Sequence, residues 1–341
     1  MKILWYLFVK IYVRTGFAFY FKKINLVGIE NIPKKRAILF VSNHQNALID
    51  PLLIGAITPR ELNFLTRADI FNKPLVKALL SSVNMLPIYR MGDGMNSLHK
   101  NEEIFQKCYD ILGKNGTVLI FPEGNHNIKK RVRILSKGFT RIVFGALENN
   151  PDLELVVVPI GINYTNAKKY ASSVSIHFGR PISVNEFYGS KEINEASTEL
   201  KHSVREAMKK LVTHIENLED HDQIIKTFRE DEFLFPEMVN QKLNSKKDLV
   251  PIQEEAVKPF NFLTPIVKVN SFFPLLIWKY VSPKIREDEF IATFRYTIGI
   301  TIFPIFYLFQ SWLVYLFLGS SYAFTYLLIS FLSVYLFTKS K

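Results

Sequence analysis

The amino-acid sequence predicts an α/β protein: a layered domain with a central, mostly parallel sheet flanked by helices, plus an N-terminal interfacial helix and a C-terminal transmembrane hairpin. Three observations predict this class. Short apolar runs rich in β-branched residues alternate with helical patterns between residue 28 and about residue 186, as in layered α/β domains. The N-terminus combines aromatic and basic residues at helical spacing, and the C-terminus contains two long stretches without charge.

Residues 1–27 predict a helix that lies in the membrane interface. Lys10 and Arg14 are one helical turn apart, which places both charges on one face. Apolar side chains can form another face, at Leu4, Leu7, Phe8 and Ile11. Because charged residues interrupt the apolar run and no small-residue cleavage site follows, we expect an interfacial helix and not a spanning segment or a signal peptide.

Residues 28–218 predict the α/β domain itself. Four apolar runs have the length and composition of buried strands: Ala37–Val41, Thr117–Phe121, Leu155–Ile160 and Val174–Phe178. Helical patterns occur at Leu75–Ser82, Leu98–Leu112, Phe139–Glu148 and Asn194–Leu218. In such folds ligands bind at the loops that leave the strands. His44 and Glu123 each follow a predicted strand, so we expect both in one site.

Residues 219–295 predict a charged linker with an interfacial segment, and residues 296–341 predict a transmembrane helical hairpin. Phe260–Val281 is apolar but interrupted by prolines and a lysine, which suits an interfacial or re-entrant segment. Thr297–Leu318 is long enough to cross a bilayer, and Tyr322–Phe337 follows after a short uncharged turn. Basic residues flank the pair, so we expect both termini on the cytoplasmic side. The alternative is a buried helical pair in a soluble protein.

The composition favours an enzyme that works on a bilayer. Hydrophobic residues make up 48% of the chain and the formal net charge is +12, which suits membrane lipids and acidic substrates as partners. The sequence has no zinc-ligand spacing and no nucleic-acid recognition motif, so we expect no nucleic-acid partner and no bound metal. Cys108 is the one cysteine, which excludes an intrachain disulfide.

The octapeptide from Asn43 to Asp50 indicates acid–base chemistry. A neutral imidazole at His44 can take a proton from an attacking alcohol, and a carboxylate at Asp50 can fix the tautomer of that imidazole. The two side chains can meet only if a turn lies between them, because six positions place them on different faces of a straight helix. A structural alternative stays open: Asp50 precedes Pro51, and the pair is typical of a helix N-cap.

A second motif follows the predicted strand that ends at Phe121. Pro122 cannot donate to a sheet ladder and should end the strand, so Glu123 lies in the turn that follows. Gly124 allows close approach of the backbone to a ligand. Basic residues come next, at Lys129, Lys130, Arg131 and Arg133. Alone these basic residues would indicate a solvated loop. Because they lie next to two candidate catalytic motifs, a role in binding becomes the stronger interpretation.

These motifs resemble four blocks of the glycerol-3-phosphate and 1-acylglycerol-3-phosphate (lysophosphatidate) acyltransferases, in the same order. The matching residues are His44 with Asp50, then Val83–Arg90, Phe121–Gly124 and Val158–Ile160. The segment Phe64–Phe71, which contains Arg67, is similar to the basic stretch that family members carry between the first two blocks. Four ordered blocks are a far more specific signal than any one of them. The resemblance covers roughly residues 28–193.

Two departures from the common pattern look like one branch of that family. Five residues separate His44 from Asp50 where the common pattern has four. Asn125 and His126 replace the usual Thr-Arg pair after the glycine. Both features are similar to the branch that includes fungal glycerol-3-phosphate acyltransferases. The missing guanidinium concerns the choice of acceptor and not the chemistry.

The resemblance implies a membrane-bound O-acyltransferase of phospholipid synthesis. It would move a fatty acyl group from an acyl-CoA or acyl-carrier-protein thioester to a hydroxyl of lysophosphatidate or glycerol 3-phosphate, without a cofactor. His44 would be the base and Asp50 its partner. The implied substrate-binding residues are Arg67 and Arg90 for the acceptor phosphate, Glu123 for the glycerol backbone, and Gly124 and His126 beside it. Two alternatives stay open: an acyltransferase for another lyso-lipid such as an aminolipid, and a catalytically dead lipid-binding scaffold.

Overall fold

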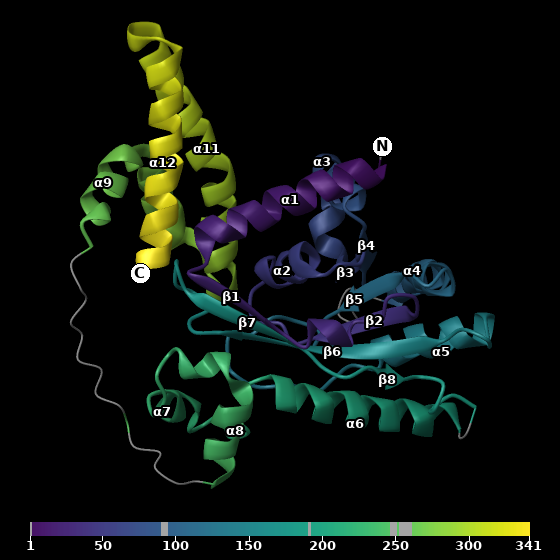
Figure 1. Cartoon of the computed structure of the whole chain (residues 1–341). Helices are drawn as coiled ribbons and strands as arrows, with labels where there is room; N and C mark the ends of the chain where they lie inside the picture. The colour runs from purple at the N-terminus through teal and green to yellow at the C-terminus, as the bar shows by residue number, and fades with distance from the viewer. Residues whose placement is uncertain (1, 90–94, 190–191, 246–250, 252–260) are drawn as a thin grey trace.

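A computed structural model describes every residue except 1, 90–94, 190–191, 246–250 and 252–260 (Figure 1). Its centre is an eight-stranded sheet with the strand order β1-β7-β6-β2-β5-β3-β4, and β8 pairs with β6. The strands are β1 (Lys23–Val27), β2 (Ala37–Ser42), β3 (Asn63–Arg67), β4 (Met85–Ile88), β5 (Thr117–Ile120), β6 (Leu155–Tyr164), β7 (Ser173–Phe178) and β8 (Ile182–Ser183).

The sheet is mostly parallel, which confirms the predicted fold class. β6, β2, β5, β3 and β4 run in one direction, whereas β7 and β8 pair with β6 in the antiparallel sense. β2, β5 and β6 are buried along their whole length, as expected for strands covered on both faces. The carboxyl ends of β2, β3, β5 and β6 therefore meet at one edge of the sheet.

Helices cover both faces of the sheet, with α1 and α2 above it and α6 below it in Figure 1. One apolar core lies under α1 (Lys2–Tyr20), α2 (Ile49–Ile57), α3 (Pro74–Ser82) and the start of α11 (Ile291–Leu318). The other lies under α4 (Met95–Gly113), α5 (Gly138–Asn149) and α6 (Ile193–Leu211). A smaller cluster involves α7 (His221–Ile225) and α8 (Pro236–Ser245).

The predicted elements of the domain are present, with ends that differ by a few residues. α6 ends at Leu211, before the predicted end at Leu218, and β6 continues to Tyr164. The sequence pattern does not predict the short strands β1, β3, β4 and β8. β1 falls within residues 1–27, and its pairing with β7 places the start of the sheet at Lys23. β4 contains Pro87, which is tolerated because β4 is at the edge of the sheet.

The C-terminal region consists of α9 (Leu263–Asn270), α10 (Phe272–Val281), α11 and α12 (Ser320–Ser340). Residues Asp288–Leu318 and Ser320–Ser340 are long and apolar enough to cross a membrane. In the most apolar part of each, 6% and 28% of the residues are buried inside the protein, so the described chain leaves most of the apolar surface of the two helices uncovered. Gly319, at φ +88°, is the single residue that links them, and they project together from the domain in Figure 1.

A buried lysine connects the sheet edge to the region that follows α6. Lys130 Nζ donates to the carbonyl oxygen of Tyr164 at 2.7 Å and lies 4.0 Å from the centre of the Phe233 ring. The backbone N–H of Lys130 donates to Nε2 of His221 at 3.0 Å. Burial lowers the pKa of Lys130 to about 7, against an opposing effect of Glu230. The basic cluster of the sequence is therefore partly internal.

We expect Lys130 to make stability depend on pH. The unfolded chain holds this proton up to about pH 10.4, whereas the folded chain loses it at about pH 7. Below pH 7 the folded protein therefore bears the full cost of burying the charge. As the pH rises above 7 this cost decreases, and the free energy of unfolding increases by at most about 1.4 kcal/mol per pH unit. Relative to Lys130→Met, the wild type should gain free energy of unfolding between about pH 7 and pH 9, measured by denaturant unfolding in micelles.

The control for this titration is the exposed Lys137. The difference in unfolding free energy between Lys137→Met and wild type should stay constant over the same pH range, because folding does not remove this side chain from solvent. A pH-independent difference between Lys130→Met and wild type would show that Lys130 remains charged in the folded protein.

Candidate active site

His44 and Asp50 form a hydrogen-bonded pair at the carboxyl edge of the sheet. His44 follows β2, and Asp50 is the second residue of α2. Nδ1 of His44 lies 2.9 Å from Oδ2 of Asp50, and the two side chains are 14% and 0% exposed. Because the carboxylate can only accept, Nδ1 carries a proton, and in the neutral imidazole Nε2 is then the nitrogen that can accept one. The turn that the sequence required between the two residues is therefore present.

The Asp50 carboxylate accepts four hydrogen bonds. Oδ2 also accepts from the backbone N–H groups of Gln45 and Asn46 at 2.7 and 2.8 Å, and Oδ1 accepts from the Tyr164 hydroxyl at 2.6 Å. Burial and the neighbouring Asp50 raise the pKa of Tyr164 well above its usual value, so this hydroxyl remains a donor. A fully buried carboxylate needs such partners, because an unpaired buried charge is very costly. These donors hold the acceptor for His44 in place.

Asp50 does not act as a helix N-cap. The N-cap of α2 is Leu48, and no side-chain cap hydrogen bond is formed there. The backbone N–H groups that donate to Asp50 precede the helix, so the Asp50 carboxylate closes the loop that follows His44. The N-cap interpretation of Asp50 is therefore wrong.

The imidazole of His44 is packed against two rings from the segment that follows β5. It stacks on Phe121 with ring centres 4.1 Å apart, and His126 meets it edge-on at 5.7 Å. Phe290, from the segment before α11, meets His126 edge-to-face with ring centres 5.0 Å apart. The backbone N–H of Asn127 donates to the His44 carbonyl oxygen at 2.9 Å. The two sequence motifs therefore meet, as expected from the parallel order of β2 and β5.

Glu123 is paired inside the protein. Its side chain is 2% exposed, and its carboxylate accepts from the backbone N–H and from Nε of Arg133, both at 3.0 Å. Arg133 also donates to Asn125. Gly124, between these partners, adopts φ +83° with open space beside its Cα, a conformation that glycine tolerates best. Arg133 therefore holds the loop after β5, a role that its place in the basic cluster did not predict.

The other predicted substrate residues lie at the same edge or outside the described chain. Arg67, the last residue of β3, is half exposed and pairs with Asp69 at 2.6 Å. His126 lies 3.9 Å from Glu287. Burial, and then the electrostatic effect of His44, lowers the pKa of His126, which disfavours the charged form that could stand in for a guanidinium. Arg90 lies outside the residues that the structure describes.

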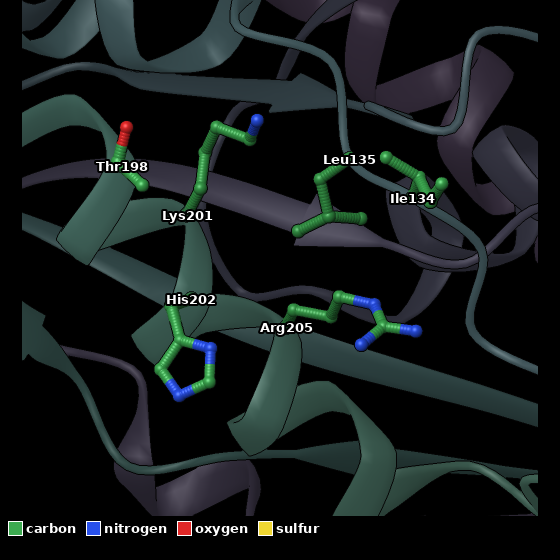
Figure 2. Close-up of a pocket in the computed structure, with 6 residues that line it drawn as sticks. All are labelled: Ile134, Leu135, Thr198, Lys201, His202 and Arg205. Carbon is green, nitrogen blue, oxygen red and sulfur yellow. The ribbon is translucent and has the colours of Figure 1, made fainter. Parts of the chain in front are cut away.

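A hollow of about 420 Å³ lies between the loop at Ile134 and Leu135 and one face of α6. Figure 2 shows Lys201 and Arg205, one helical turn apart, extending from α6 on either side of Leu135. The remaining lining residues are Thr198 and His202. The lining includes neither member of the His44–Asp50 pair.

Residues 23–163 match the family model described as Acyltransferase. Glycerol-3-phosphate O-acyltransferase 2 of Saccharomyces cerevisiae is 28% identical over 125 residues, which cover 37% of this chain and 17% of that protein. A chloroplastic 1-acyl-sn-glycerol-3-phosphate acyltransferase of Arabidopsis thaliana is 29% identical over 119 residues, which cover 35% of this chain and 32% of that protein. The match therefore spans less than a third of either relative.

Among solved structures, the crystal structure of the 1-acyl-sn-glycerophosphate acyltransferase PlsC from Thermotoga maritima aligns with a TM-score of 0.38 and 20% identity, over 54% of this chain and 71% of that chain. The family model and the named relatives confirm the resemblance carried by the four sequence blocks. A fungal glycerol-3-phosphate acyltransferase is among these relatives, in agreement with the branch that the longer His-to-Asp spacing indicated.

Proposed function

We propose that this chain, in which residues 23–163 form a domain of the acyltransferase family, is a membrane-bound O-acyltransferase of glycerolipid synthesis. The acyl donor would be a thioester of CoA or acyl carrier protein. The acceptor would be a hydroxyl of glycerol 3-phosphate or lysophosphatidate. The observation that carries this proposal is the His44–Asp50 pair, in which a fully buried carboxylate holds Nδ1 and leaves Nε2 of His44 free to accept a proton.

In the proposed reaction, Nε2 of His44 takes the proton of the acceptor hydroxyl as its oxygen attacks the thioester carbonyl carbon. Asp50 stabilises the imidazolium that forms. The new C–O bond is complete when the tetrahedral intermediate collapses, the C–S bond breaks, and the imidazolium returns the proton to the departing thiolate. No nucleophilic serine or cysteine is needed, because the thioester is already activated and the substrate supplies the alcohol.

The remaining site residues support binding roles. The resemblance assigns Arg67 and Arg90 to the acceptor phosphate, and a guanidinium offers that group a bidentate fork. The resemblance assigns Glu123 to the glycerol backbone, and the pairing of Glu123 with Arg133 supports a role in holding the Gly124 loop to which the glycerol would bind. His126, whose pKa is lowered chiefly by burial, would serve as a hydrogen-bond partner and not as a phosphate clamp.

The choice of phosphate-binding residues can be tested by kinetics. Arg90→Ala should raise the KM for a phosphorylated acceptor far more than His126→Ala, because only the guanidinium is charged at neutral pH. Arg90→Lys should restore the KM partly, since lysine keeps the charge and loses the bidentate fork. An unchanged KM for glycerol 3-phosphate and lysophosphatidate in Arg90→Ala would exclude this role and would favour a lyso-lipid without a terminal phosphate.

We further propose that α11 and α12 cross the bilayer, with both termini and the catalytic domain on the cytoplasmic side. The length and exposure of both helices support the hairpin. α1 would lie in the interface, since it exposes Leu4, Leu7, Phe8 and Ile11. α3 would join it there, because Leu75 is 85% exposed and Trp5 of α1 donates to Ser82 of α3.

Extraction experiments test the hairpin. The full-length protein should remain in the membrane pellet after carbonate or high-salt washing, because salt screens surface charges within about 8 Å at physiological strength and does not release a spanning helix. A variant that lacks residues 297–341 should still bind anionic vesicles, but salt should release it. Full-length protein in the soluble fraction after carbonate treatment would exclude a spanning hairpin.

The function itself is tested by thioester turnover with purified protein and a panel of acceptors. Release of free thiol that depends on glycerol 3-phosphate or lysophosphatidate is the expected result. Turnover with an aminolipid acceptor alone would identify a different lyso-lipid acyltransferase. Lipid binding without any turnover would identify a scaffold that has kept the fold.

A further inference from the structure

The loop that carries His44 has two anchors, and one of them lies outside the matched acyltransferase domain. Four consecutive backbone N–H groups, from Gln45 to Leu48, follow the catalytic histidine. The first two donate to Asp50. The third, from Ala47, donates to the carbonyl oxygen of Glu289 at 3.2 Å. The fourth, from Leu48, donates to Oγ1 of Thr293 at 3.1 Å.

Glu289 and Thr293 belong to the base of the C-terminal hairpin. Thr293 is in the first turn of α11, and Glu289 is in the short turn just before it. The hydrogen bond between Thr293 and Leu48 joins residues that are 245 positions apart in the sequence. Residues 23–163, which match the family model, therefore supply partners for two of the four amides, and the hairpin supplies partners for the other two.

The base of α11 is itself firmly attached to the domain. Arg295 Nη1 donates to the carbonyl oxygen of Lys168 at 2.6 Å, and Lys168 Nζ pairs with Asp288 at 3.0 Å. Tyr296 stacks on Phe17 of α1 with ring centres 4.5 Å apart, and its hydroxyl donates to the carbonyl oxygen of Val13 at 2.7 Å. Thr293 therefore offers Leu48 an acceptor whose position is fixed from two directions.

We propose that Thr293 is a positioning residue for the His44–Asp50 pair, so that the C-terminal hairpin completes the catalytic loop. This inference rests on the proposed function. Leu48 is the N-cap of α2, the helix that carries Asp50, and its N–H would otherwise lack a helical partner. The hydroxyl of Thr293 holds this amide while Asp50 holds the two amides nearest His44. Together they set the distance between base and carboxylate, and acyl transfer depends steeply on such positions.

The experiment compares three variants of the full chain in nanodiscs. Thr293→Val keeps the branched shape and removes the acceptor. Thr293→Ser keeps the acceptor. Thr297→Val is the matched control, because Thr297 lies one turn further along α11, is exposed, and donates to the Thr293 carbonyl oxygen of its own helix.

Thr293→Val should lower kcat by about ten- to a hundredfold, a range typical of small displacements of reacting groups, while the KM for donor and acceptor stays unchanged. Thr293→Ser and Thr297→Val should keep the kcat of the wild type. If Thr293 had a purely structural role, Thr293→Val would lower thermal stability but would not lower kcat selectively while KM stayed unchanged. Wild-type kcat in Thr293→Val, or equal loss in Thr293→Ser, would overturn the proposal.

Hydrogen exchange gives a readout that does not require activity. Amides in the peptide that contains Gln45–Leu48 should exchange faster in Thr293→Val than in wild type or Thr297→Val, because the Leu48 amide has lost its acceptor. Unchanged exchange would overturn the proposal even if the wild type were active. Conversely, a wild type that acylates no acceptor would refute the proposed function, and the exchange result would still decide whether Thr293 holds the loop.

Discussion

Replacing His44 by alanine should abolish acyl transfer while folding and membrane attachment stay intact. A buried carboxylate holds the Nδ1 side of the imidazole and leaves Nε2 as the candidate base, and loss of general-base catalysis typically lowers the rate by about 10²- to 10⁴-fold. The backbone of the loop should persist, since Asn127 bonds to the His44 carbonyl oxygen and not to its ring. The measurement is thioester turnover under saturating donor and acceptor, together with thermal unfolding.

The matched control for this variant is His202→Ala, which removes an exposed histidine on α6. It should retain the full rate. If purified His44→Ala kept near wild-type turnover, His44 would be a structural residue and another base would have to be found.

Asp50→Asn should be the second most damaging change. The amide is neutral, so it cannot stabilise the imidazolium, and we expect a fall in kcat of about 10²- to 10⁴-fold. The variant should also lose stability, because all four partners of the carboxylate are donors. An amide places its own N–H₂ group against one or more of them, and an unsatisfied buried polar group costs about 1–3 kcal/mol.

Tyr164→Phe separates these two effects. It removes one of the four donors and leaves the charge of Asp50 in place, so its rate should fall far less than that of Asp50→Asn. Measuring the rates and the unfolding free energies of both variants in parallel separates the effect of the charge from the effect of the lost hydrogen bond. Equal loss of rate in the two would mean that the charge of Asp50 is not what assists His44.

The sequence predicted the His44–Asp50 contact because both residues lie in one short segment and the chemistry requires them to meet. It could not predict what surrounds them. Tyr164 reaches Asp50 across 114 positions and Thr293 reaches Leu48 across 245, and neither residue belongs to a local pattern. These contacts depend on the order of strands in the sheet and on the return of α11 to its edge, which are properties of the packed chain.

The arginines show a different limit of sequence analysis. Arg133 was one of several basic residues following Glu123, and its partner is Glu123 itself. A guanidinium fits an internal carboxylate and an external phosphate equally well, because both present paired oxygens. Spacing alone does not distinguish the two. Burial distinguishes them, since the Glu123 side chain is 2% exposed and burying its charge without a charged partner would be costly.

The short strands mark a third limit. β1 and β3 have five residues each and β4 has four, and their side chains are only partly buried because they lie toward the ends of the sheet. Alternation over so few residues does not stand out from a loop. The long buried runs of β2 and β6 were evident for the opposite reason, since both faces are covered and nearly every residue is apolar.

The end of α12 returns to the end of α1. Oγ1 of Thr338 donates to the Phe19 carbonyl oxygen at 2.9 Å and Nζ of Lys339 to the Phe21 carbonyl oxygen at 2.8 Å, just before β1 begins at Lys23. In a bilayer the domain would then be attached to the hairpin at both its first and its last helix, and it could not rotate about one flexible connection. The distance of His44 from the lipid surface and its orientation would then be fixed. The site would therefore select acceptors by the depth of their hydroxyl group along the membrane normal as well as by their chemistry.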